Sequence, residues 1–281
     1  QAVEIDPAEP LAYAGLAEGY ITLGHGGAER LDSFPLARAA AEKTLTLDSD
    51  MAAAVGCLAD VALYYEWDFP KAERLFKRAL ELNPSLAMTH YHYAWYLVLF
   101  DRLDEAIVEH KLARDIDPLR ALHTGWLGRL YQFGGRFDEA IIEAQKGLEL
   151  NPKFWPSYLV MRCAYSKLGR HEEAIEAARR LAELNPRRGK AQLAIAYALA
   201  GQREKAQALE AELKALPPGT TDLDRLYVVM GDKDAAFREL EAAYKNHKTT
   251  LPWIRTRGYD YDTLRGDPRF NDLLHRMNLP E

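Results

Sequence analysis

The sequence predicts an all-α solenoid, a right-handed superhelix of about seven helix-turn-helix repeats that ends in a C-terminal capping helix. The first observation is a fixed period of about 34 residues, at which the segment Ala79–Pro84 returns three times in related form. The second is that small residues keep the same period. Self-similarity at a fixed period marks architectures in which each unit packs on its neighbours. The evenly spaced prolines are Pro84, Pro118, Pro152 and Pro186, and the small residues are Ala72, Ala106, Ala140 and Ala174.

Seven units are expected over residues 10–246, each with two helices. An insertion over residues 25–36 separates the two helices of the first unit. We expect the last two units to have shortened first helices, over residues 189–200 and 221–230. In chain order the first helices carry Leu16-Ala17, Leu58-Ala59, Tyr93-Ala94, Leu127-Gly128, Met161-Arg162, Leu193-Ala194 and Leu223.

Each repeated position has a physical reason. Gly128 and Ala140 are small, which lets two helix backbones approach closely. Gly135 and Gly169 fall between the two helices of a unit, where a residue in the left-handed conformation ends the first helix. The prolines follow the second helix because proline cannot continue a helix but can begin one. We therefore expect hairpins that bury their apolar stripes by stacking.

The fourth unit carries the fullest pattern: Leu127-Gly128, then Tyr131, Gly135, Ala140 and Pro152. In both residues and period it resembles the tetratricopeptide repeat (TPR). The resemblance implies a solenoid whose first helices line a concave groove, and TPR proteins bind extended peptides in such grooves.

The two ends depart from the repeat. Residues 1–9 look like the end of a second helix whose first helix is missing, so we expect at least one more repeat upstream. Residues 247–281 are expected to form a capping segment. Asp267 and Pro268 provide an N-cap followed by proline at the first helical position. The helix that follows has one apolar face, made of Phe270, Leu273, Leu274 and Met277.

Two segments resemble one bacterial group of long modular regulators. They are Leu264–Phe270 with Leu273-Leu274, and Tyr64–Phe69 in the second unit. In that group a TPR region follows a winged-helix DNA-binding domain, an adenylate cyclase domain or a Ser/Thr kinase domain. The resemblance implies a bacterial regulatory region, and no motif of those N-terminal domains occurs in this chain.

Composition excludes several classes of function. Of 281 residues 48% are hydrophobic and 28% charged, and the net charge of −6 argues against direct nucleic-acid binding. No apolar run spans a membrane, and two distant cysteines suggest reduced thiols. We expect a cytoplasmic protein. Because the chain begins without Met, we expect its natural N-terminus to be missing, so the sequence gives no indication of targeting. His90 and His92 are two residues apart and face different sides of a helix, so no metal site is expected.

No nucleotide-binding, hydrolase or kinase motif occurs. We therefore expect no enzyme activity and no cofactor. The expected site is the concave groove, where a protein or peptide would bind. The set of Lys and Asn residues that chaperone-binding members use does not match. The expected binding residues are Asp60, Tyr91, Trp95, Arg129, Gln132, Phe133, Ser166 and Lys167, with Cys163 beside them.

Within this set Trp95 and Arg129 are the expected anchors, because Trp and Arg are enriched at binding hot spots. The alternative is that Tyr91 and Trp95 pack between adjacent repeats. For the whole chain we expect a non-catalytic interaction scaffold, the regulatory or sensory region of a larger bacterial signalling or transcription-regulating protein. Two alternatives stay open: the regulatory part of a cyclase or kinase whose catalytic domain lies elsewhere, and a self-association module that forms homo-oligomers.

Overall fold

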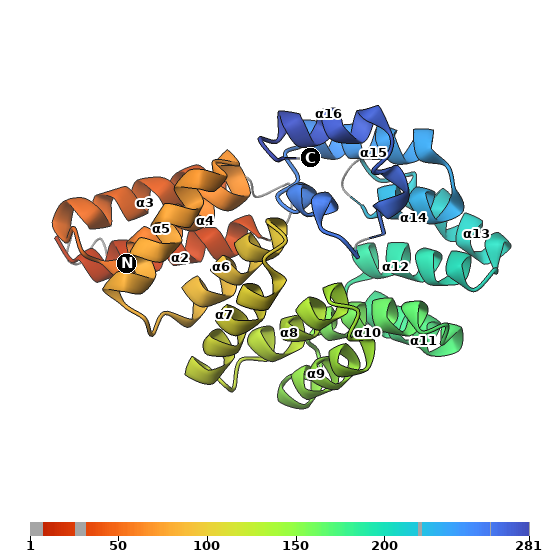
Figure 1. Ribbon diagram of the computed structural model, residues 1–281, viewed down its shortest axis with the longest axis horizontal. Coiled ribbons are helices and arrows are strands. Elements are labelled where there is room, and N and C mark those ends of the chain that lie inside the picture. Colours follow the sequence, from red (N-terminus) through yellow and green to blue (C-terminus); the bar gives the residue numbers. More distant parts are fainter. Residues whose placement is uncertain (1–7, 26–31, 219–220, 259, 281) are drawn as a thin grey trace.

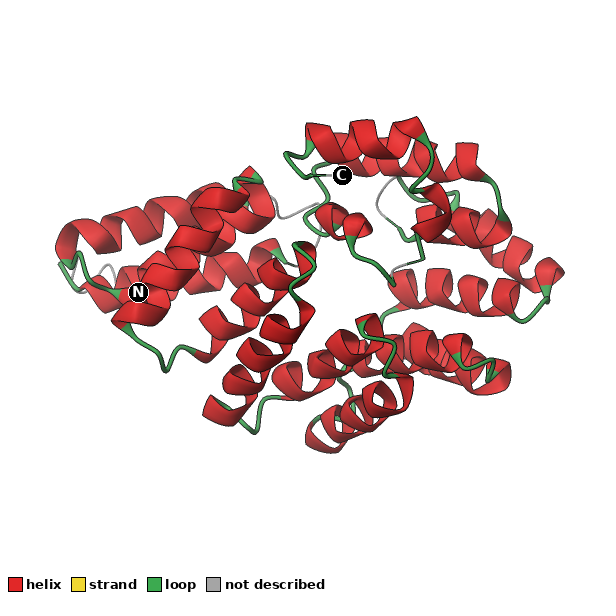
Figure 2. Ribbon diagram, viewed as in Figure 1, coloured by secondary structure: helices red, strands yellow, loops and turns green. Residues whose placement is uncertain are grey.

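The computed structural model describes residues 8–25, 32–218, 221–258 and 260–280. In these residues it is built of helices and turns without a strand (Figure 2). Seven helical hairpins follow one another around a curve (Figure 1). They are α2 (Pro10–Gly24) with α3 (Ser33–Leu47), α4 (Ala52–Val61) and the π-helical turn η2 (Ala62–Glu66) with α5 (Phe69–Leu82), α6 (Ala87–Leu99) with α7 (Leu103–Ile116), α8 (Ala121–Phe133) with α9 (Phe137–Leu150), α10 (Trp155–Lys167) with α11 (His171–Leu184), α12 (Pro186–Leu199) with α13 (Arg203–Leu213), and α14 (Leu223–Met230) with α15 (Lys233–Lys245).

The turn inside each hairpin uses one left-handed residue from the second hairpin on, as the sequence predicts at two of these turns. Gly135 and Gly169 have φ of 72°, and Gly201 and Gly231 have φ of 76° and 84°. In the third hairpin Asp101 takes this conformation with φ 59°, and in the second Trp67 does so with φ 53°. A bulky side chain at positive φ is strained, so Trp67 calls for a compensating contact.

Small residues set the distance between helices. A Cβ at Gly128 would lie 2.7 Å from the carbonyl oxygen of Ala140, which confirms the predicted close approach. Gly189 is tighter still, because a Cβ there would lie 2.2 Å from the Cα of Ala182. Asn185 ends α11 and also caps α12. The prediction of a shortened first helix is therefore wrong for α12, which has 14 residues: the missing part is the loop before it. It is right for α14, which has 8 residues.

Two expectations fall partly outside the described residues. Residues 1–7, the expected remnant of an earlier repeat, lie outside them, as do residues 26–31 of the expected insertion. The end of that insertion is helical instead, because α3 begins at Ser33 and buries Phe34. The domain boundaries at 9, 10, 246 and 247 stay predictions.

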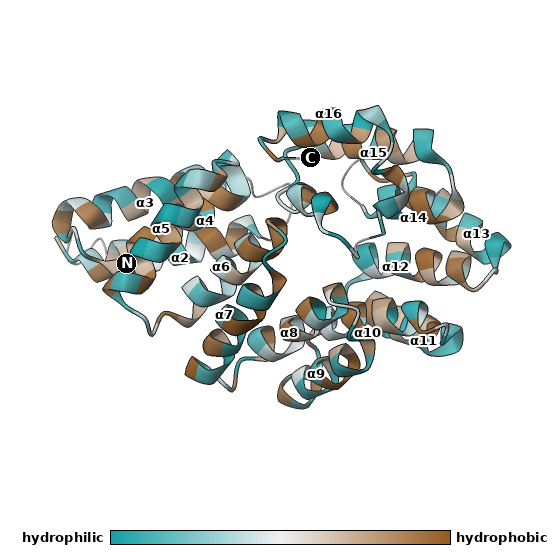
Figure 3. Ribbon diagram, viewed as in Figure 1, coloured by the Kyte–Doolittle hydropathy of each residue, from teal (hydrophilic) through white to brown (hydrophobic). Residues whose placement is uncertain are grey.

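After α15 the chain forms the 3-10 turns η3 (Leu251–Arg255) and η4 (Asp262–Leu264) and the helix α16 (Pro268–Arg276). We call residues 247–258 and 260–280 the closing segment. The Asp267 side chain accepts a hydrogen bond from the Arg269 amide, as expected of an N-cap. The predicted face of α16 is buried, and both α15 and α16 carry polar and apolar residues (Figure 3). No helix among the described residues is long and apolar enough to cross a membrane.

The closing segment does not stop at the last repeat. It folds back so that η3 lies on the inner side of the curve, and the chain end comes beside the second hairpin (Figure 1). His247 Nε2 donates to the carbonyl oxygen of Tyr65 at 2.5 Å, and Asn278 Nδ2 donates to that of Trp67 at 3.4 Å. These contacts join residues 182 and 211 positions apart, whereas ordinary repeats contact their neighbours.

Candidate functional site

One repeated position on successive first helices faces the inner side of the curve, and two of its residues, Trp95 and Arg225, contact the closing segment. It is occupied in turn by Trp95, Arg129, Cys163, Ile195 and Arg225, at nearly equal spacings along the chain. Every one of these except Trp95 is buried, and Trp95 is half-buried. Because equivalent residues of a solenoid point the same way, this position defines the inner face on which the closing segment lies.

Trp253 of η3 is the main apolar contact on the inner face. Its ring stacks on Tyr64 with 5.3 Å between centroids and meets Trp95 edge-on at 6.5 Å. Its Nε1 donates to the carbonyl oxygen of Trp95 at 3.2 Å. Trp253 is 5% exposed, so the indole is almost wholly removed from water. A buried aromatic ring with its N–H satisfied is what a binding anchor provides.

Arg255 fastens the same turn to the third hairpin. Its Nη1 donates to the carbonyl oxygen of Leu99 at 2.6 Å and lies 3.1 Å from Asp101 Oδ2. Leu99 and Asp101 are at the end of α6, where helix carbonyls lack partners within the helix. A cation at a helix C-terminus is also favoured by the helix dipole.

Trp67 and His247 hold the start of the closing segment. Their rings stack with centroids 4.0 Å apart, and Trp67 also contacts Tyr244 at 5.8 Å. Trp67 stands where four later hairpins have glycine, so its left-handed backbone is strained while its ring packs on the returning chain. Residues Tyr64–Phe69, which carry part of the resemblance to modular regulators, thus contact the closing segment, through His247, Trp253 and Asn278.

Further along the inner face, three arginines gather around Cys163 and Asp260. Arg129 and Arg162 are each 1% exposed and Arg225 is 4% exposed. Arg225 Nη2 lies 2.5 Å from Asp260 Oδ2 and 4.0 Å from Cys163 Sγ. Arg129 donates to Gln132 and Arg162 to Gln192, at 2.8 Å and 2.5 Å.

The charges of the three arginines lower the pKa values of Asp260 and Cys163. Burial raises the pKa of Asp260, but the charges of Arg225, Arg162 and Arg129 outweigh it and leave the pKa well below its usual range. Burial likewise raises the pKa of Cys163, and the same three arginines bring it down to about 7. The three guanidinium groups therefore favour both the carboxylate form of Asp260 and the thiolate form of Cys163.

A second buried cluster contains histidines from three helices. His92 Nδ1 lies 2.5 Å from Asp60 Oδ1, and Tyr91 packs against the rings of His92, His110 and His123. His110 Nε2 donates to the carbonyl oxygen of His123 at 2.7 Å. Burial lowers the pKa of His110 to about 3 and that of His123 to about 4, so both are neutral near pH 7.

The structure brings most of the predicted binding residues to the inner face but does not leave them open. Trp95 packs against Trp126 and Phe133 of the next hairpin as well as Trp253, so the packing alternative holds for it. The two expected anchors are therefore not freely exposed in the groove: Arg129 is 1% exposed, and Trp95 is half-buried against Trp253. Asp60, Gln132 and Cys163 are buried, Tyr91, Phe133 and Ser166 are half-buried, and Lys167 is exposed. Their role in binding stays a prediction.

Sequence reasoning missed Arg162, Arg225 and Asp260 as members of the site. One signal was available: Arg162 stands one repeat period after Gly128, at a position where other units have a small residue. No repeat pattern pointed to Asp260 or Trp253, because the closing segment has no counterpart within the repeats.

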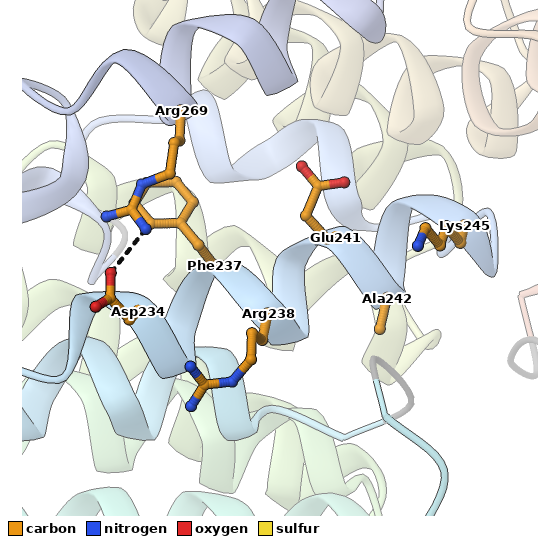
Figure 4. A pocket seen from close by; sticks show the side chains of 7 residues that line it. All are labelled: Asp234, Phe237, Arg238, Glu241, Ala242, Lys245 and Arg269. Carbon is orange, nitrogen blue, oxygen red and sulfur yellow. Dashed lines mark hydrogen bonds and ion pairs between the residues drawn. The ribbon is translucent and has the colours of Figure 1, made fainter.

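Outside the inner face and the histidine cluster, the described residues offer weaker candidates for a binding site. They contain no group of three metal-ligating side chains. A shallow hollow over α15 is lined by residues of both charges (Figure 4). There Arg269 lies over the Phe237 ring at 4.1 Å and pairs with Asp234 at 2.7 Å, while Glu241 pairs with Arg276. These contacts attach α16 to the last repeat.

Comparison with known proteins finds relatives that align with only part of this chain. Residues 61–110 and 163–222 match one tetratricopeptide-repeat profile, and residues 125–154 match a second. The transcriptional regulator HilA of Salmonella typhimurium is 29% identical over 122 residues, which are 43% of this chain and 22% of that protein. HilA of Salmonella typhi aligns to the same extent. The chain thus matches about a fifth of the length of these relatives.

Solved structures share the fold. PilW, described as a widely conserved type IV pilus biogenesis factor, has a TM-score of 0.61 at 20% identity, over 73% of this chain and 92% of PilW. The APC/C Cut9–Hcn1 hetero-tetramer gives 0.63 at 15% identity, over 98% of this chain and 50% of the matched chain. PilF of Pseudomonas aeruginosa gives 0.53 at 20% identity, over 94% and 99%. With its repeat profiles, its seven stacked hairpins and these neighbours, the chain belongs to the tetratricopeptide-repeat family.

Proposed function

We propose that this chain is a non-catalytic interaction module of a larger bacterial regulator, and that its inner face is the surface that recognises a partner. The observation that carries the proposal is that a peptide segment already lies there. Residues 251–255 place an anchored Trp against Tyr64 and Trp95 and donate to backbone carbonyls at the end of α6. This is how a short segment is held by a helical groove, with an aromatic anchor and backbone hydrogen bonds.

The inner face is thus a binding surface filled by the chain itself. A partner segment must compete with the closing segment, whose effective concentration is high because it is tethered to α15. Such competition makes binding conditional on release of the closing segment, a property suited to a regulatory region. The partial similarity to HilA supports a place in a transcription regulator, with the closing segment held against the solenoid until a partner displaces it.

The test uses the full chain and a fluorescent synthetic peptide of residues 251–265. Trp253→Ala in the chain removes the anchor and opens the inner face. We expect the peptide to bind this variant at least roughly tenfold more tightly than the unaltered chain, because losing a hot-spot aromatic costs about 2 kcal/mol or more. The peptide with Trp253→Ala is the control and is expected to bind weakly to both chains. Equally weak binding of all combinations, with the variant chain folded by circular dichroism, would disprove the proposal.

A second candidate, self-association, follows from the same geometry. A closing segment that leaves its own inner face can enter that of another copy, as in domain swapping. Measuring the solution mass of the Trp253→Ala chain over a concentration series separates the two. Dimers that form through the closing segment would disappear when residues 247–281 are removed, whereas binding of the added peptide would remain.

A further inference from the structure

One carboxylate of the closing segment lies among three buried arginines of the inner face. Two other carboxylates nearby are engaged elsewhere. Asp222 lies 3.8 Å from Arg188 and 3.5 Å from Lys248, and it accepts from Gln192 at 2.7 Å. Asp224 accepts a hydrogen bond from the Tyr261 hydroxyl. Asp260 is then the carboxylate that pairs with Arg225 Nη2 at 2.5 Å, and the nearby charges of Arg162 and Arg129 help to keep its pKa low.

Burying a guanidinium away from water is costly unless an anion compensates it. Arg162 shows this cost directly: its Nη2 bonds Gln192, but its Nε is buried without a hydrogen-bond partner among the described residues. Burial, together with the charges of Arg225 and Arg129, lowers the pKa of Arg162. The arginines come from α8, α10 and α14, first helices of one curved wall that hold the side chains at fixed positions.

We propose that Arg129, Arg162 and Arg225 form a carboxylate-binding pocket for an acidic side chain of a partner segment, and that Asp260 occupies this pocket when the chain is closed. The inference rests on the proposed function, since the pocket lies on the same inner face. Arginine is suited to this task because its planar donors match a carboxylate. A partner that displaces the closing segment should therefore share its features: an extended segment with an aromatic anchor followed by an acidic residue.

This pocket differs from the hollow over α15, where the carboxylates Asp234 and Glu241 already pair with Arg269 and Arg276. It also differs from the histidine cluster, where Asp60 and His92 face each other. At the pocket the cationic groups come from the repeats and the anion comes from the closing segment. The anion can therefore leave while the cations stay.

The first test is a rescue experiment on the full chain. Asp260→Ala removes the carboxylate, and alkylation of Cys163 by iodoacetamide is followed by peptide mass spectrometry. We expect alkylation to become at least about tenfold faster, because the covering segment loosens, and to slow again when sodium acetate is added. Sodium chloride at the same ionic strength should not slow it. Cys57, which is buried away from the pocket, is the internal reference.

Asp262→Ala is the matched control, since Asp262 belongs to the same segment but is exposed and pairs with Arg265 at 3.0 Å. It should leave the rate at Cys163 unchanged. Adding Arg162→Gln to Asp260→Ala should abolish the effect of acetate. Protection by inorganic phosphate but not by acetate would overturn the assignment to a carboxylate, and an equal effect of chloride would overturn the pocket itself.

The second test does not require the Asp260→Ala chain to fold. The peptide of residues 251–265 is compared with the same peptide carrying Asp260→Asn, both bound to the Trp253→Ala chain. We expect the Asp260→Asn peptide to bind roughly tenfold more weakly, because a buried charge pair loses its anion. Equal affinity of the two peptides would refute the pocket while leaving the inner face as a binding surface. If neither peptide binds, the proposed function fails as well.

Discussion

The middle hairpins, α6 to α11, are stabilised by contacts between neighbouring helices, whereas the closing segment depends on contacts with residues far away in the sequence. In the middle, each helix packs on the next through small residues such as Gly128 and Ala140, and the pattern returns in every repeat. The closing segment has no repeat. Besides its pairs with the last repeat, such as Arg269 with Asp234, it contacts residues 156 to 211 positions away, through Trp253, Arg255 and Asn278. Neighbour contacts keep a solenoid folded at every point, whereas the long-range contacts of one terminal segment can open together while the repeats stay intact. The repeats therefore carry the stability of the fold, and under the proposed function the closing segment carries the regulation.

The largest expected effect comes from the repeat core. Phe76 of α5 is wholly buried and packs against Tyr93 and Tyr96 of the next hairpin. We expect Phe76→Ala to lower the free energy of unfolding by about 3–5 kcal/mol, through lost burial and a cavity. Denaturant titration measures it.

The same variant also tests whether the closing segment depends on the repeats, because the second and third hairpins provide its docking site. Hydrogen exchange should therefore rise in residues 251–255 together with α5 and α6. If the closing segment kept its protection while α5 lost it, docking would not depend on these hairpins.

A smaller effect is expected from acid. His110 and His123 have pKa values of about 3 and 4 when folded, lowered by burial, against about 6.5 when unfolded. The unfolded chain therefore binds more protons below pH 6.5, so their contribution is intact above that pH and is lost as the pH falls toward 4. At pH 5.5 we expect a loss of about 1.4 kcal/mol for each histidine relative to neutral pH.

Thermal melting at pH 7.5 and pH 5.5 measures this loss. A chain with both His110→Gln and His123→Gln should show a flatter pH dependence, whereas His171→Gln, at an exposed helix start, should not. The acid effect acts on hairpins of the middle region. A steep acid transition that persisted in the double variant would place the sensitive groups elsewhere, with His25, whose pKa burial lowers to about 3, the next to replace.

The smallest expected effect concerns the turn glycines. Gly169 has φ of 72° and open space around it, so Gly169→Ala should cost about 1 kcal/mol from backbone strain alone. Gly15 also has open space, but it lies within α2, so Gly15→Ala should instead stabilise by about 0.5–1 kcal/mol. Opposite signs in the two melting curves would show that conformation, not space, fixes the turn. Equal signs would contradict this account and weaken the explanation of the strained Trp67.

The period of the sequence was enough to predict the repeats, because each hairpin is determined by local patterns and by its two neighbours. The left-handed turns at Gly135 and Gly169, the buried face of α16 and its Asp267 cap all follow from such patterns. The prediction for α12 failed because the sequence shows a shorter spacing but not whether a helix or a loop has lost the residues. Of the two expected anchors of the groove, Arg129 is buried and Trp95 half-buried, and whether the groove binds a partner stays a prediction.

By itself, then, the sequence determined the fold, the positions of the hairpins and which helix face turns inward. The tertiary structure alone decided what lies on that face. Trp253 reaches Tyr64 and Trp95, and Asp260 reaches Arg225, across sequence separations that follow no period. A periodic pattern encodes contacts between neighbours, but where a non-repeating segment docks depends on the curvature that all the hairpins accumulate together. That curvature brings the end of the chain back to its second hairpin.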